Sequence, residues 1–126
     1  MIPLNDYQKK IYQTLSSTEY KVFDEVPTDE ELPLITIGDY TLSDGVVKNE
    51  SYVISQAINI YSEYEGKKEI NEMVSVTLDK LKGLVDEYIT DTFFIADIRL
   101  LESSVSRNEE GFYMANLNIQ FELEGN

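Results

Sequence analysis

A chain of 126 residues, 42% of them hydrophobic, has the size and apolar content of one ordinary domain with its own core. It contains no cysteine and no histidine, which excludes disulfides, thiolate metal sites and most nucleophilic or acid–base catalysis. The formal charge of −14 excludes ordinary binding to nucleic-acid phosphates. We expect a single domain over residues 1–126, with no export signal and no membrane-spanning segment.

The first predicted element is a helix over residues 4–15. Its apolar side chains recur at spacings of three and four: Leu4, Tyr7, Ile11 and Leu15. A short strand over residues 20–25 follows and stops before Pro27, because proline cannot donate to a strand ladder. A charged loop leads to a second strand over residues 33–38. We expect these two strands to pair as a hairpin with a wide loop.

Residues 39–50 follow no clean period and predict a long loop. Four apolar side chains lie there among turn-forming residues: Tyr40, Leu42, Val46 and Val47. Two interpretations of this loop stay open. It can be an arm that contacts a partner, or it can fold back onto the core of its own chain.

The second half of the chain predicts a strand, a helix and a hairpin. Residues 52–62 alternate as a central strand, and residues 67–82 carry apolar side chains at helical spacing. Two long strands, residues 93–107 and 112–124, are joined by a turn at residues 108–111. The order α-β-β-β-α-β-β predicts an α+β fold, with a mainly antiparallel sheet and both helices packed on one face.

No residue pattern points to a reacting centre. The acidic patch formed by Asp24, Glu25, Asp29, Glu30 and Glu31 contains oxygen ligands for Mg²⁺ or Ca²⁺. The calcium-loop pattern is absent, so we interpret the patch as a solvated loop, and neither glycine-rich nucleotide-binding pattern occurs. We predict no catalytic, cofactor-binding or metal-binding residue, no cofactor, and no enzymatic activity.

Protein contacts are the remaining role for the unusual side chains. We expect Tyr52 and Tyr113 to pack in or across the sheet, whereas Tyr40 and Tyr64 lie in predicted loops, where tyrosine suits a protein interface. The candidate interface residues are Tyr40, Leu42, Val46, Val47, Tyr64, Asn108, Glu109, Glu110 and Gly111.

Two short signatures lie in order along the chain. One is the run Pro33-Leu34-Ile35-Thr36-Ile37-Gly38, and the other is the run Ile58-Asn59-Ile60-Tyr61-Ser62. With the opening helix, the helix after Gly66 and the terminal hairpin, they make the chain resemble the small tail completion proteins of siphophages. This family includes tail terminators and tail-to-head joining proteins. It often has tryptophan where this chain has Tyr61.

The resemblance implies a virion protein of a phage or prophage, assembled in the host cytoplasm. Such a protein forms a ring, usually a hexamer, at the head-proximal end of the tail tube, where it ends tube growth and joins the tail to the head connector. The implied partners are copies of the same chain, the tail tube protein, the head completion protein, and DNA that passes through the lumen without specific binding. No membrane is involved.

The acidity keeps three explanations open: solubility, a bore that repels passing DNA, or mimicry of DNA toward a basic partner. The sequence therefore leaves two alternatives to the virion role open. One is an acidic DNA-mimic inhibitor, and the other is a small ligand-binding or metal-binding module of the same architecture.

Overall fold

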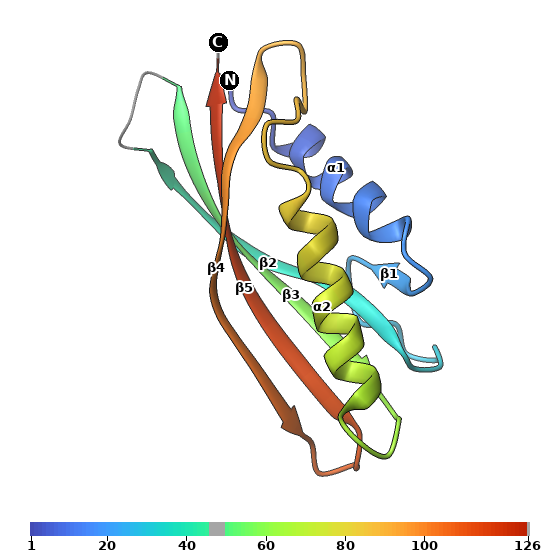
Figure 1. The fold of residues 1–126 in the computed structure, drawn as a ribbon. Helices are drawn as coiled ribbons and strands as arrows, with labels where there is room; N and C mark the ends of the chain where they lie inside the picture. Colours follow the sequence, from blue (N-terminus) through green and yellow to red (C-terminus); the bar gives the residue numbers. More distant parts are fainter. Residues whose placement is uncertain (46–49, 126) are drawn as a thin grey trace.

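Two helices cover one face of a five-stranded sheet in the computed structural model, which describes residues 1–45 and 50–125 (Figure 1). This arrangement confirms the α+β class and the predicted order of elements. The elements are α1 (Leu4–Ser16), β1 (Lys21–Phe23), β2 (Leu34–Asp44), β3 (Ser51–Ser62), α2 (Lys68–Lys82), β4 (Phe93–Arg107) and β5 (Tyr113–Gly125).

The strands lie in the order β1-β2-β3-β5-β4, so β3 is central as predicted. All neighbouring pairs are antiparallel except β1 and β2, which run parallel. The predicted hairpin between these two strands is therefore wrong. Lys21 is opposite Leu34, so the chain must pass back along residues 24–33 before β2 begins. Residues 24–33 are long enough for this return because β1 itself is only three residues long.

The predicted loop over residues 39–50 is wrong for its first part, because β2 continues to Asp44 and pairs with β3 over that length. A β-bulge between Ile37 and Tyr40 shifts the register. It explains why the alternation of side chains is lost in the sequence at this point. A Cβ at Gly38 would lie 3.2 Å from the Ala57 carbonyl oxygen, so the bulge favours glycine there. Val46 and Val47 lie outside the described residues.

The core lies between the helices and the sheet, and it is built by one face of each strand. α1 contributes Tyr7, Ile11 and Leu15, and α2 contributes Ile70, Met73 and Leu81. From the sheet, the fully buried side chains include Ile54, Ile58, Ile60, Leu117, Ile119 and Phe121. Tyr52 and Tyr113 are partly buried against this core, as predicted for strand tyrosines.

One buried polar network ties α1 to the bulge in β2. The Tyr7 hydroxyl donates to Gln56 Oε1 at 3.0 Å, and Gln56 Nε2 donates to the Gly38 carbonyl at 2.8 Å. Both side chains are almost completely buried, with 1% of each exposed. Burial, more than the nearby Tyr40, raises the pKa of the Tyr7 phenol, so Tyr7 stays a neutral hydrogen-bond donor.

Candidate functional site

The predicted interface residues that the structure describes lie at two separate places on the sheet. Figure 1 shows the two regions, the second half of β2 and the end of the sheet where β4 turns into β5. Tyr40 and Leu42 are in the second half of β2, about 40% exposed, opposite Gln56 and Ile54 of β3. Tyr64 follows the far end of β3 and is 52% exposed, at the end of the sheet where β4 turns into β5. The structure therefore does not unite these residues in one patch, and their contact with a partner stays a prediction.

The β4–β5 turn is held by its own hydrogen bonds. The backbone N–H of Asn108 donates to the Phe112 carbonyl at 2.9 Å, and Asn108 Oδ1 accepts from the Phe112 N–H at 3.1 Å. Gly111 adopts a φ of 94°, a left-handed conformation that favours glycine. Asn108 and Gly111 thus shape the turn, whereas Glu109 and Glu110 project from it as exposed carboxylates.

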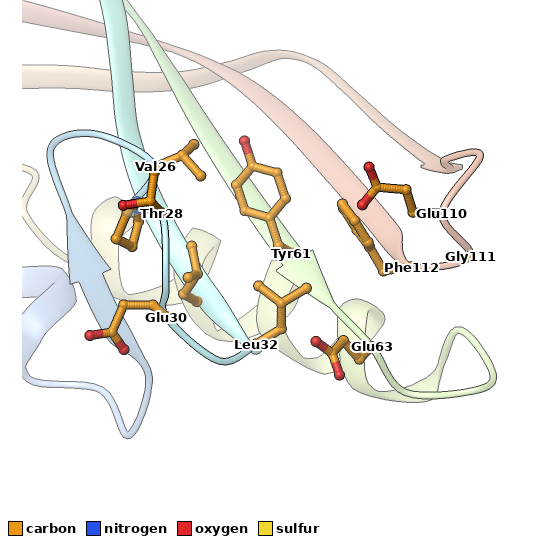
Figure 2. A pocket seen from close by; sticks show the side chains of 11 residues that line it. Val26, Thr28, Glu30, Leu32, Tyr61, Glu63, Glu110, Gly111 and Phe112 are labelled. Carbon is orange, nitrogen blue, oxygen red and sulfur yellow. The ribbon is translucent and has the colours of Figure 1, made fainter.

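A pocket of about 600 Å³ lies beside this turn on the face of the sheet that carries no helix. Figure 2 shows Tyr61 of β3 between Val26 of the β1–β2 connection and Phe112 of the β4–β5 turn. The Tyr61 and Phe112 rings meet edge to face, with centroids 6.3 Å apart. Leu34 lies opposite Tyr61 in the β2–β3 ladder. The pocket therefore brings together a cluster of apolar side chains from segments distant in the sequence.

Carboxylates lie beside these apolar side chains in the same pocket. Glu30, Glu63 and Glu110 are in its wall, each from a different connection between elements. Those connections, residues 24–33, 63–67 and 108–112, together hold nine Asp or Glu residues and one lysine, a formal charge of −8 out of −14 for the chain. More than half of the net charge is thus concentrated in the segments that meet at the pocket.

Lys21 of β1 fixes one wall of the pocket in place. Its Nζ lies 3.0 Å from Glu30 Oε2 and donates to the Glu31 carbonyl at 2.7 Å. Both ionic side chains are more than 40% exposed, so this ion pair contributes little stability by itself. Its consequence is positional, because it links Glu30 and Glu31 of the returning segment to β1.

The sequence does not predict this pocket, because its lining residues belong to elements that are distant in the chain. The acidic patch formed by Asp24, Glu25, Asp29, Glu30 and Glu31 predicts a solvated loop, and the alternation around Tyr61 predicts only a strand face. The available signal was the presence of Val26 and Leu32 among acidic residues, since apolar side chains in a charged loop need a surface to lie against.

The helix-free face of the sheet carries a second group of carboxylates. Asp97 of β4 lies directly opposite Glu122 of β5, and Glu124 follows on the same side of the strand. Burial raises the pKa of the Glu122 carboxyl, and the charges of Glu124 and Asp97 raise it further. Like charges directly opposite each other weaken strand pairing. Folding stability therefore does not explain this cluster.

Two stretches of strand edge have no strand partner in the described part of the chain. β4 is the outermost strand. Residues 86–89 bond to the backbone of its first residues, so its edge is open only beyond Ile95. On the other side of the sheet, β1 pairs with only the first three residues of β2. Both open edges carry exposed apolar side chains. Leu100 and Leu101 lie on β4, and Tyr40 and Leu42 lie on β2.

Within residues 1–45 and 50–125, no group of three or more Asp or Glu side chains is arranged to hold a metal ion. The same residues include no helix long and apolar enough to cross a bilayer.

At the level of sequence, no protein-family model and no curated protein matches the chain. At the level of structure, the fold is similar to that of a chain in the virion of a native gene transfer agent particle. The TM-score is 0.73, and the similarity covers 91% of this chain and 92% of that chain at 17% sequence identity. A likeness of this kind shows a shared fold over nearly the full length of both chains.

Proposed function

We propose that this chain is a structural virion protein of the tail terminator type, one domain over residues 1–126, and not an enzyme. In this proposal it forms a ring, with six copies as the expected number, at the head-proximal end of a phage tail tube. The ring ends tube growth and joins the tail to the head connector. The observation that carries the proposal is the fold shared over nine tenths of both chains with a component of a gene transfer agent virion.

Ring closure needs two different surfaces on each subunit, because each copy meets its two neighbours through unlike faces. The open edges of β4 and of the second half of β2 fit this need. They lie at opposite edges of the sheet. β4 beyond Ile95 and β2 beyond its contact with β1 have no strand partner among the described residues, and both carry exposed apolar side chains. Pairing of β4 in one copy with β2 in the next would extend the sheet from subunit to subunit.

In this proposal, the helix-free face of the sheet lines the bore of the ring. That face carries Asp97, Glu102, Glu122 and Glu124 on β4 and β5, with Arg99 as the basic residue among them. By contrast, α1 and α2 together hold five lysines and four acidic residues. Carboxylates facing the lumen would repel DNA phosphates and let DNA pass without binding.

The test is electron microscopy and native mass spectrometry of the purified chain, alone and mixed with purified tail tubes. We expect rings at one end of each tube. Leu101→Lys and Leu42→Lys should remove or weaken the rings, because each places a charge on an open edge. Val85→Lys is the matched control, since Val85 is similarly exposed but lies outside both edges.

Circular dichroism should report the same fold for all three variants, because the altered side chains lie on the surface. Tubes that stay uncapped by the unaltered chain would contradict the proposal. Rings whose lumen is lined by the helices would contradict the assignment of the bore.

A further inference from the structure

The pocket at the β4–β5 turn combines two properties that select one kind of occupant. Its lining includes a cluster of apolar and aromatic side chains, formed by Val26, Leu32, Leu34, Tyr61 and Phe112. Its wall and approaches are acidic, with Glu30, Glu63 and Glu110 at the pocket itself. An apolar side chain gains from entering the pocket, and positive charges next to it gain from the surrounding carboxylates.

We propose that this pocket docks a segment of another protein that presents one aromatic or aliphatic side chain flanked by lysine or arginine. A volume of about 600 Å³ accommodates such a side chain with part of its backbone. Two basic residues near the pocket are already engaged. Lys21 pairs with the Glu30 carboxylate and donates to the Glu31 carbonyl, and Arg107 Nε donates to the Gly111 carbonyl at 3.4 Å. In the described part of the chain, the other two carboxylates of the wall, Glu63 and Glu110, form no ion pair.

A second copy of this chain is disfavoured as the occupant. Each copy carries a formal charge of −14, and the connections around the pocket are its most acidic part. Repulsion between copies therefore opposes self-docking at this place. A nucleic acid is disfavoured for the same reason. This inference depends on the pocket and its charge, and it does not require that the chain forms a ring.

The experiment is a titration of the ¹⁵N-labelled chain with two blocked peptides, followed by amide chemical shifts. The first peptide is Lys-Lys-Phe-Lys-Lys, and the second is Lys-Lys-Ala-Lys-Lys, which has the same charge but little apolar surface. We expect the phenylalanine peptide to shift amides of Val26, Tyr61 and Phe112 and to bind about tenfold or more tightly than the alanine peptide.

Two variants with matched controls locate the site. Glu63→Lys combined with Glu110→Lys should weaken binding of the phenylalanine peptide about tenfold. Asp79→Lys combined with Asp91→Lys changes the net charge equally at exposed positions outside the pocket and should leave the pocket shifts unchanged. Val26→Ser removes apolar surface from a residue that is 60% exposed and should weaken binding several-fold without loss of the fold.

Equal affinity for the two peptides would overturn the proposal in favour of charge mimicry of a nucleic acid. Sedimentation at several protein concentrations tests whether a second copy of this chain occupies the pocket. Self-association that Glu63→Lys with Glu110→Lys abolishes would show that a second copy fills the pocket, and it would also overturn the proposal. If the chain binds the phenylalanine peptide but forms no rings, the docking proposal stands. Only the proposed tail function would then be contradicted.

Discussion

The two faces of the same sheet place very different demands on their side chains. On the helix-covered face, Ile58 of β3 lies opposite Leu117 of β5, and both are fully buried. On the other face, the next pair along the same ladder is Asn59 and Asn116, whose side chains hydrogen-bond to each other at 2.7 Å and stay accessible. The comparison teaches that the covered face accounts for folding. The side chains of the helix-free face contribute little to folding, so this face can carry charges that weaken strand pairing.

The largest expected effect comes from truncating matched neighbours on β5. Leu117→Ala removes a fully buried side chain and leaves a cavity, so we expect a loss of about 2–5 kcal/mol in the free energy of unfolding. Asn116→Ala removes an exposed side chain and should cost less than about 1 kcal/mol. Urea denaturation of both variants checks the contrast. Equal losses would break the distinction between the two faces.

The next effect tests the polar network on the covered face. Tyr7→Phe removes the donor to Gln56 Oε1 and leaves a buried acceptor without its partner. We expect a loss of about 1–3 kcal/mol, measured by thermal and urea unfolding. Tyr64→Phe is the control, because Tyr64 is 52% exposed, and it should change stability by less than about 0.5 kcal/mol. A loss at Tyr64 as large as that at Tyr7 would contradict this assignment.

A smaller effect is expected at the turn that borders the pocket. Gly111→Ala places a Cβ on a residue with a φ of 94°, and the strain should lower the free energy of unfolding by about 1 kcal/mol. Gly66→Ala meets no atom within 4 Å and should be close to neutral. Chemical denaturation measures both. If Gly111→Ala is as neutral as Gly66→Ala, the turn conformation described here is wrong.

The smallest effect concerns the acidic cluster on the open face and depends on pH. The folded state raises the pKa of Glu122, so the folded chain holds that proton more tightly than the unfolded chain does. The carboxylate therefore destabilises the fold above the raised pKa, and the penalty disappears below the ordinary carboxyl pKa. Glu122→Gln should stabilise the chain at neutral pH by less than about 1 kcal/mol, because the group is largely solvated.

The measurement for Glu122→Gln is the free energy of unfolding at neutral and acidic pH. The advantage of the variant should shrink as the pH falls through the carboxyl range. Asp91→Asn, at an exposed residue of the segment between α2 and β4, serves as the control and should show no comparable trend. An advantage that persists unchanged in acid would exclude charge repulsion as its cause.

Much of this fold was readable from local periodicity. The 3.6-residue spacing of Tyr7, Ile11 and Leu15 and the strict alternation over β3 and β5 determined which side chains face the core. The reason is physical, because each period follows from the geometry of one element and needs no knowledge of its neighbours. The same local signals predicted the turn at residues 108–111 and a helix that ends at Lys82, as α2 does.

Only the tertiary structure decided what depends on contacts between distant segments. It made β1 parallel to β2, extended β2 through a bulge at Gly38, and brought Val26, Tyr61 and Phe112 to one pocket. It also set Asp97 opposite Glu122. Strand direction, register and pocket walls are properties of pairs of segments, and no periodicity within a single segment encodes its partner.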